Sequence, residues 1–541
     1  MRAIITFLAL AFSLSLSAQD SLMAFVLNPL AARLQPQPVE GYKYEVAQRV
    51  FQTLLKANGS FRLPPPELVM NDGRRYMAWM QADKRQIGLE EKAYDICSGL
   101  GKDSLNALAA LLSHEIIHYY EKHSWKRHFI SMDEDSGINM EEGKAYEQQA
   151  DYLGGILALS AGFNTYHTLD TLLKEAYSGY GLPEKIRGYP SLSERLKLSA
   201  QTAKRLQNMY QLYQTANLLA LIEQHGRAAE YYDYILKEYQ GYELYNNGGA
   251  NALLAALELT PPDEMPFVLP VELDLNSRLA QLGARLPEDV AARRHRFLEQ
   301  AEQWLKNALL LNEDRSTAHL NLSITYLLRE EWLDAEYRAR KAMAIADATS
   351  GSGTIANADI LLGVIAALRG DTAAAALQFQ KAEQARPTLA AGNLAMLRGG
   401  TALLPEPAEP ERGVEMIAGI EPDTYLAYPE YESELIVSRG VYNGFQPKDS
   451  AQILMHYEED GPHYAMFLQT NDNYHGATNR GISLGDSISQ IHQAYGPPNR
   501  ILTLADGQCL AYDEQKILFL LDETAALRRW VVFRKSFDPE E

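Results

Sequence analysis

The chain has 541 residues, of which 22% are charged and 46% hydrophobic, a composition typical of folded globular proteins. This length exceeds what one hydrophobic core usually organises, so we expect several domains. The formal net charge of −20 produces a field that repels phosphate backbones, which argues against nucleic acid as a partner.

The first residues have the pattern of a secretory signal peptide. Arg2 precedes an apolar run from Ile4 to Phe12, and small and polar residues follow it. We predict a signal peptide at residues 1–18, cleaved after Ala18, with cleavage after Ser17 as the alternative. No later stretch approaches about 18 uninterrupted apolar residues. We therefore expect a protein that is not membrane-spanning and is periplasmic or secreted.

Residues 19–205 form the first predicted domain, which is rich in helix and carries a small sheet. Apolar spacing and helix stop signals indicate the elements. Helices are expected at 40–58, 103–123, 140–161, 169–176 and 193–206, and short strands at 67–70, 76–81 and 86–89. Cys97 lies in this domain and Cys509 lies far from it, so two free buried thiols are a simpler expectation than a disulfide.

Residues 206–404 form the second predicted domain, a solenoid of helical repeats. Small and apolar residues recur at an offset of 34 residues, the period of the tetratricopeptide repeat. One unit has Ala301, Leu305 and Ala308, and the next has Ala335, Ala339 and Ala342. A third unit has Leu362-Gly363, Ala375, Phe379, Ala382 and Pro387, and a proline-rich insertion is expected at about 260–297.

Residues 405–410 alternate proline with other residues and predict a semi-rigid linker. Beyond it the apolar period falls towards two, which indicates strands. They are expected at 453–455, 465–470, 509–512, 517–521 and 530–533, with one helix from Asp486 or Ser487 to Tyr495. Residues 412–541 are thus predicted to form a small α+β domain, and the whole chain a multidomain, mainly α-helical protein.

The chemistry-bearing motif lies in the helix expected at 103–123. His114 and His118 flank Glu115 in the pattern H-E-x-x-H, so both imidazoles lie on one helix face, one turn apart. The opposite face carries apolar residues, which predicts an amphipathic helix with this face buried in the core. They are Leu105, Leu108, Leu112, Ile116 and Tyr119. Two histidines at this spacing can bind one metal ion, and the intervening glutamate can act as a general base.

A catalytic zinc ion takes three protein ligands, so the pair needs a third. Glu147, Ala150, Asp151 and Gly154 share one face of the helix expected at 140–161. The small residues permit close packing against the first helix. Glu147 is therefore predicted as the third ligand, and Asp151 as the acceptor that fixes the tautomer of a ligand histidine.

These motifs resemble the zinc metallopeptidases of the HtpX and BepA type, the family designated M forty-eight, with a gluzincin ligand set. The resemblance covers about residues 40–200, including a closing segment from Pro190 to Arg195. It implies a zincin-type domain with one Zn²⁺ per chain. Tyr189 stands where relatives carry a histidine, so Tyr189 and Arg195 are candidates for oxyanion binding or gating of the metal.

The leading hypothesis is an exported zinc metalloendopeptidase of envelope protein quality control, with protein or peptide substrates and a protein partner on the repeats. The alternative is a repeat-based adaptor with a vestigial or structural zinc site. Binding of peptidoglycan or polysaccharide by residues 412–541 is a third hypothesis, which depends on aromatic residues alone.

Overall fold

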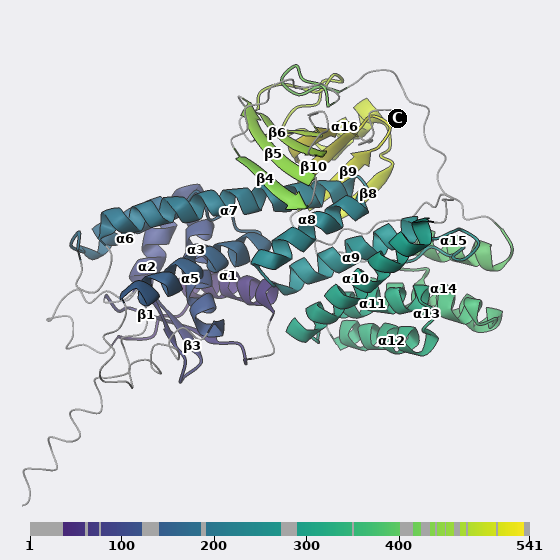
Figure 1. Cartoon of the computed structure of the whole chain (residues 1–541), viewed down its shortest axis with the longest axis horizontal. Coiled ribbons are helices and arrows are strands. Elements are labelled where there is room, and N and C mark those ends of the chain that lie inside the picture. Colours follow the sequence, from purple (N-terminus) through teal and green to yellow (C-terminus); the bar gives the residue numbers. More distant parts are fainter. Residues whose placement is uncertain are drawn as a thin grey trace, which may run out of the picture. The chain divides into compact units, whose positions relative to one another are not determined.

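The computed structural model describes residues 36–59, 63–74, 77–121, 140–185, 191–271, 289–348, 351–400, 415–422, 433–438, 441–448, 451–458, 466–471, 474–504 and 507–534. Within them the protein is mainly helical, with one three-stranded and one eight-stranded sheet (Figure 1). The chain divides into two compact units, Met1–Tyr210 and Gln211–Glu541, and the division falls within helix α7 (Leu192–Leu221). The predicted signal peptide lies outside the described residues.

No helix in the described parts of the chain is long and apolar enough to cross a membrane.

The sheet of the first unit is small and has one buried face. Strand β3 (Gln86–Glu90) lies between β1 (Glu67–Asn71), to which it is parallel, and β2 (Ala78–Gln81), to which it is antiparallel. All three strands were predicted. The indole of Trp79 lies over Gly88, where an added Cβ would be 2.0 Å from the ring. Only a glycine fits at this crossing of β2 and β3.

Helix α3 (Ser104–Tyr120) is the centre of the first unit. It packs against α1 (Tyr42–Asn58), α2 (Glu91–Ser98), α5 (Met140–Ser160) and α6 (Leu169–Tyr180), and against two strands of the sheet. Every residue from Ala107 to Tyr119 is buried, whereas Leu105 is 48% exposed. Four of the five residues assigned to the core face, Leu108, Leu112, Ile116 and Tyr119, are buried as predicted, and only Leu105 differs from the prediction. The face that carries the histidines is buried as well, because α5 packs closely against it.

The second unit contains a row of helices that pack in sequence, each on the next. They are α8 (His225–Glu238), α9 (Tyr242–Glu258), α10 (Asp289–Leu311), α11 (Ser316–Leu328), α12 (Trp332–Ala348), α13 (Ser352–Leu368), α14 (Thr372–Ala382) and α15 (Pro387–Leu397). The small residues of the predicted repeats lie at the helix contacts: Ala301, Ala308, Ala335, Ala339 and Ala342 are all fully buried. Gly363 lies against Phe379, where an added Cβ would be 2.6 Å from the ring.

The C-terminal part of the second unit is an antiparallel sheet of the order β4-β5-β6-β7-β11-β10-β9-β8. Its strands are β4 (Ser433–Ser438), β5 (Val441–Lys448), β6 (Ala451–Glu458), β7 (Phe467–Thr470), β8 (Arg500–Leu504), β9 (Gly507–Tyr512), β10 (Ile517–Asp522) and β11 (Leu527–Phe533). The five predicted strands correspond to β6, β7, β9, β10 and β11. Strands β4, β5 and β8 were not predicted, so the sheet is larger than expected.

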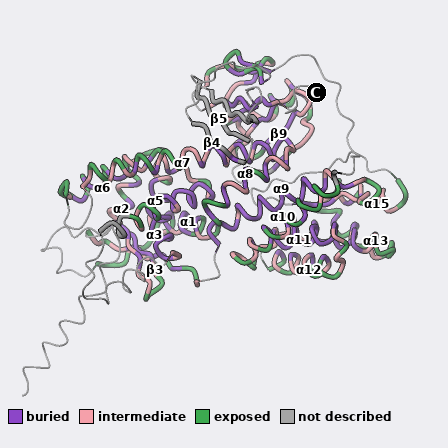
Figure 2. The backbone as a smooth tube through the Cα atoms, in the orientation of Figure 1, coloured by how far each residue is buried: buried purple, intermediate pink, exposed green. Residues whose placement is uncertain are grey.

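One helix covers the core of this sheet. Helix α16 (Ile488–Tyr495) begins at a capping box in which Ser487 and Gln490 satisfy each other's backbone groups, as its predicted start requires. Its buried residues pack with aromatic side chains of β9, β10 and β11. Figure 2 shows buried residues along β9 and along central helices such as α3 and α9.

The two cysteines are free and buried. Cys97 lies in α2 and Cys509 in β9, so the expectation of two free thiols is confirmed. Burial raises the pKa of each thiol to about 12. Both thiols therefore stay protonated at neutral pH.

Candidate metal centre

Close packing of α3 and α5 builds the site. Ala150 is fully buried between them. At Gly154 the helix backbones approach so closely that an added Cβ would lie 3.0 Å from the backbone nitrogen of His114 and 3.1 Å from the carbonyl carbon of Ser113. The predicted role of Gly154 in close helix packing is confirmed, and Glu147, two turns before Gly154, lies on the same helix face.

Three donor atoms converge between the helices. The Nε2 atoms of His114 and His118 are 3.0 Å apart, and Glu147 Oε2 lies 3.3 Å from the first and 3.4 Å from the second. His114 is 5% exposed and His118 is 1% exposed. The structure therefore brings together the three predicted ligands in a buried cluster that can hold a metal ion.

Asp151 lies one turn after Glu147 in α5 and contacts the other ring nitrogen of His114, Nδ1. His114 Nδ1 is 2.8 Å from Asp151 Oδ1. A carboxylate at this position accepts the Nδ1 proton, which leaves Nε2 facing Glu147 and the other histidine. The predicted acceptor is thus in contact with a predicted ligand, and it fixes the orientation of the ring.

The charges of the cluster are strongly coupled. Burial acts to lower the pKa of His114, but hydrogen bonds to Asp151 and Glu147 outweigh it and hold this pKa well above its ordinary value. Burial acts to raise the pKa of Glu147, but the charge of His118 and hydrogen bonds from both histidines lower it far below its ordinary value. A metal ion binds only a ring nitrogen that carries no proton, so a proton and a metal ion compete for Nε2 of His114.

The donor set fits a transition metal better than Ca²⁺ or Mg²⁺. Two imidazole nitrogens and one carboxylate oxygen are typical ligands of zinc and its neighbours, whereas the hard cations prefer oxygen alone. The three donors come from three side chains, so a bound ion would keep at least one coordination position for another ligand.

The remaining predicted site residues have different positions. Glu115 is fully buried next to His114 in α3. Arg195 lies near the start of α7, where its Nη1 is 3.5 Å from the hydroxyl of Tyr177 on α6. Tyr189 lies outside the described residues. A role for Tyr189 or Arg195 in oxyanion binding or gating therefore stays a prediction.

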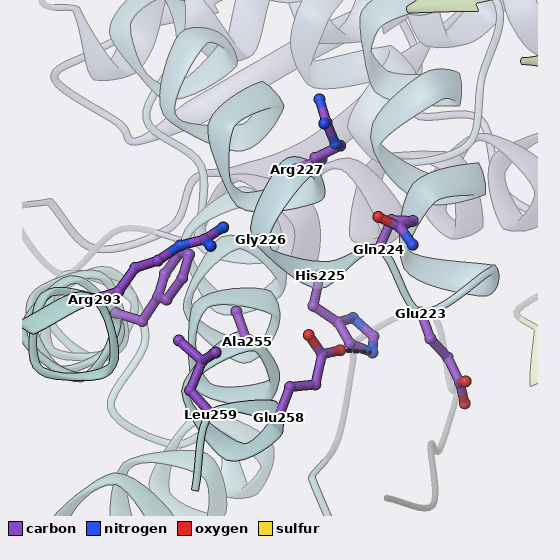
Figure 3. A pocket seen from close by; sticks show the side chains of 10 residues that line it. Glu223, Gln224, His225, Gly226, Arg227, Ala255, Glu258, Leu259 and Arg293 are labelled. Carbon is purple, nitrogen blue, oxygen red and sulfur yellow. Dashed lines mark ion pairs between the residues drawn. The ribbon is translucent and has the colours of Figure 1, made fainter. Parts of the chain in front are cut away.

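A second polar cluster lies in the second unit and was not predicted. A cavity of about 140 Å³ opens beside His225 at the start of α8, Glu258 at the end of α9, and Arg293 on α10. Figure 3 shows His225 and Glu258 pointing toward each other, with 3.7 Å between Nε2 and Oε1. The sequence carried no signal for it, because isolated polar residues of three helices meet only through packing.

Burial sets the charges of this pair. It lowers the pKa of His225 to about 4, helped by the charge of Arg500 and opposed by a hydrogen bond to Asn251. Burial and the charge of Glu223 raise the pKa of Glu258, whose side chain is 39% exposed. Both directions favour the uncharged forms of the two side chains.

Neither a protein-family model nor a curated protein sequence matches the chain. The interpretation of the metal centre therefore depends on its own geometry and on the chemistry of its donors.

Proposed function

We propose that this protein is an exported zinc metalloendopeptidase. The observation that carries the proposal is the convergence of His114, His118 and Glu147 within 4.8 Å of one another, with Glu115 buried in the same turn of α3 as the two histidines. The order of the residues resembles the family designated M forty-eight. Export and a role in envelope protein quality control are part of the proposal, and they depend on the N-terminal sequence and on that resemblance.

A set of three protein ligands among the residues that the structure describes favours a catalytic over a structural ion. Structural zinc sites are closed by four protein ligands, whereas catalytic sites use three and keep the fourth position for water or substrate. A bound zinc ion supplies a Lewis acid that polarises a carbonyl group and lowers the pKa of water to about 7. A structural site would also need no general base.

Each side chain has a distinct task in the proposed reaction. Glu115 follows a ligand histidine, so its carboxylate projects about 100° around the helix from that ligand. It accepts the proton of the attacking water and later donates it to the leaving amine. Asp151 keeps His114 in the tautomer that binds a metal, and Glu147 contributes the negative charge of the ligand set.

The adaptor and peptidase hypotheses differ in the role that they give to the buried carboxylate of Glu115. In an adaptor the repeats alone would bind a partner, and Glu115 would have no task that requires a carboxylate in the core. Burying such a group costs several kcal/mol, which favours a catalytic role. The peptidase proposal therefore places binding on the repeats and bond cleavage on the first unit.

The test compares Glu115→Gln with the wild-type full chain. Glutamine keeps the volume of the side chain and cannot take a proton, so we expect loss of cleavage of an unfolded protein substrate with the zinc content unchanged. Glu175→Gln, at an exposed position of α6, is the matched control and should cleave as fast as wild type. Metal analysis of a His114→Ala, His118→Ala double variant tests whether zinc binds at this site.

Three results would contradict the proposal. Equal cleavage by Glu115→Gln and wild type would exclude the assigned base, and absence of cleavage by the wild-type chain would support the adaptor. One zinc per chain in the double histidine variant would show that the ion binds elsewhere.

A further inference from the structure

The cavity beside His225 contains a ring nitrogen that accepts no hydrogen bond from the described residues. The other ring nitrogen, Nδ1, lies 3.0 Å from Asn251 Oδ1. The orientation of this amide is fixed, because Asn251 Nδ2 donates to the carbonyl oxygen of Asn247 at 2.9 Å. Nδ1 of His225 therefore carries the proton, and Nε2 is an acceptor. Glu258 Oε1 is 3.7 Å from Nε2, which exceeds hydrogen-bonding distance.

His225 is buried but directed into the cavity. It is 3% exposed, it lines the cavity together with Glu258, and Figure 3 shows the two side chains facing each other. A buried acceptor without a hydrogen bond costs free energy. Because Nε2 and Oε1 are 3.7 Å apart, one nitrogen atom can lie about 2.9 Å from both. An ammonium group, which carries three donors, fits between these two acceptors.

Hydrogen-bond donors line another part of the same cavity. Helix α8 begins without a side-chain cap, and the backbone N–H groups of His225 and Gly226 donate to no other described residue. Such a helix start attracts an anion. Arg293 on α10 also lines the cavity, and Figure 3 shows its guanidinium directed towards the start of α8. These groups favour a carboxylate as their ligand.

The rest of the wall is apolar, and the cavity is small. Ala255, Leu259 and Phe297 complete the lining, and the volume is about 140 Å³. An added Cβ at Gly226 would lie 3.2 Å from the ring of Phe297, so this glycine keeps the wall thin. A cavity of about 150 Å³ holds a benzene molecule, which has about six non-hydrogen atoms. The volume therefore fits a small molecule better than a polypeptide segment.

The charge of Glu258 depends on what occupies the cavity. Burial and the charge of Glu223 raise its pKa to about 8, while the charge of Arg293 acts against them. The carboxyl group is therefore mostly protonated at pH 7. An ammonium group beside it favours the carboxylate, so binding of a cation at pH 7 should release a proton. The other ionisable groups that line the cavity are Glu223, His225, Arg227 and Arg293.

We propose that this cavity binds a free α-amino acid of the size of alanine. Its ammonium group donates to His225 Nε2 and Glu258, and its carboxylate accepts from Arg293 and from the first turn of α8. A phosphate ion would be repelled by the carboxylate of Glu258, and a metal ion by the guanidinium of Arg293. A zwitterion matches both kinds of group. The site belongs to the second unit, and its failure would leave the proposed peptidase activity untouched.

The experiment is isothermal titration calorimetry of the full chain with L-alanine. We expect saturable binding of one L-alanine per chain. Propionate lacks the ammonium group and ethylamine lacks the carboxylate, so each should bind at least about ten-fold more weakly. The His114→Ala, His118→Ala double variant removes the candidate metal ligands and should bind L-alanine as wild type does. These comparisons need no substitution in the cavity itself.

Two substitutions in the cavity test the assigned contacts. Glu258→Gln and Arg293→Gln should each weaken binding of L-alanine at least about ten-fold. Glu299→Gln and Arg296→Gln, at exposed positions of α10 outside the cavity lining, are the matched controls and should bind as wild type does. Circular dichroism checks that all four variants keep the helix content of wild type.

A proton balance tests the role of Glu258 independently. Titrations of wild type in two buffers of different ionisation enthalpy measure the protons released on binding. We expect release of about one proton per L-alanine at pH 7 and much less at pH 9, where Glu258 is already a carboxylate.

The proposal is overturned if L-alanine shows no saturable binding, or if propionate or ethylamine binds as tightly as L-alanine. Loss of binding in the double histidine variant would also overturn it, because L-alanine would then bind at the candidate metal centre. Wild-type affinity in Glu258→Gln or Arg293→Gln, or no proton release at pH 7, would exclude the assigned contacts.

Discussion

The closest backbone approach in the candidate site allows a quantitative test, the substitution Gly154→Ala. An added Cβ would lie 3.0, 3.1 and 3.2 Å from three backbone atoms of Ser113 and His114, whereas ordinary contacts begin at 3.4 Å. Helices α3 and α5 must therefore separate by a few tenths of an ångström. Metal–ligand distances tolerate only about 0.2 Å, so the separation should impair the ligand geometry.

The expected effects on stability and on metal binding differ. Alanine improves helix propensity by about 1 kcal/mol, while overpacking a core costs about 1 to 3 kcal/mol, so the net loss in the free energy of unfolding should be small. Zinc affinity should fall about ten-fold, which corresponds to about 1.4 kcal/mol. Competition with a fluorescent zinc chelator measures the affinity, and urea unfolding measures the stability.

The neighbouring glycine provides the matched control. At Gly155 an added Cβ would meet the Leu206 side chain, with its Cδ1 at 2.3 Å, and not the backbone of α3. Gly155→Ala should therefore lower stability and leave zinc affinity near the wild-type value. Equal zinc affinity in Gly154→Ala and wild type, or an equal loss in both variants, would refute the argument that the approach of α3 and α5 sets the ligand geometry.

Three further predictions concern other parts of the molecule. Asp151→Ala should weaken zinc affinity about 10 to 100-fold, and a loss near ten-fold is expected because the Asp151 side chain is 43% exposed. Competition with a zinc chelator measures this loss. Unchanged zinc affinity would contradict the role of Asp151 in orienting His114. The pKa of His225 is lowered to about 4 from an ordinary 6.5, so the unfolded state takes up the proton first as the pH falls. The contribution of His225 to the free energy of unfolding should then decrease by about 3 kcal/mol between pH 6.5 and pH 4. The difference between wild type and His225→Gln in urea titrations should isolate this contribution from the opposing one of Glu258, whose pKa is raised. Gly363→Ala should destabilise the second unit by about 1 to 2 kcal/mol, whereas Gly392→Ala, whose Cβ would meet nothing within 4 Å, should be neutral or slightly stabilising in thermal unfolding.

Local periodicity explains why most of the candidate site could be predicted. The spacing of His114 and His118 is a property of one helix, and a helical face shared by Glu147, Ala150 and Gly154 indicated where a second helix could approach. The predicted packing of α3 and α5 needed only these two helices to be neighbours in space. The prediction did not depend on the length of the segment that joins α3 to α5. That segment, residues 122–139, lies outside the described residues.

Periodicity failed where the environment of an element decides its burial. Helix α3 packs against α1, α2, α5, α6 and two strands, and the apolar pattern of its own sequence did not show that nearly all of its residues would be buried. The exposed position of Leu105 was missed for the same reason. The two hydrogen bonds between the backbone of Val268 and the side chain of Asn393, 125 positions away, could not be predicted either, because such a contact leaves no periodic pattern in the sequence.

The burial of the site argues for function over stability. Ser113, His114, Glu115 and His118 are all less than 10% exposed, in the helix that forms the centre of the first unit. Buried ionisable groups lose their hydration, and apolar residues of similar volume usually leave a core at least as stable. Packing alone therefore gives no reason to place two imidazoles and a carboxylate here, with Glu147 facing them from α5. A bound cation changes that balance, because it replaces the lost hydration of the ligands and makes their convergence favourable. Glu115 is not accounted for in this way, since His114, His118 and Glu147 already supply the donors. Its burial is therefore best explained by the proposed reaction, in which a carboxylate beside a bound metal ion would accept and return a proton.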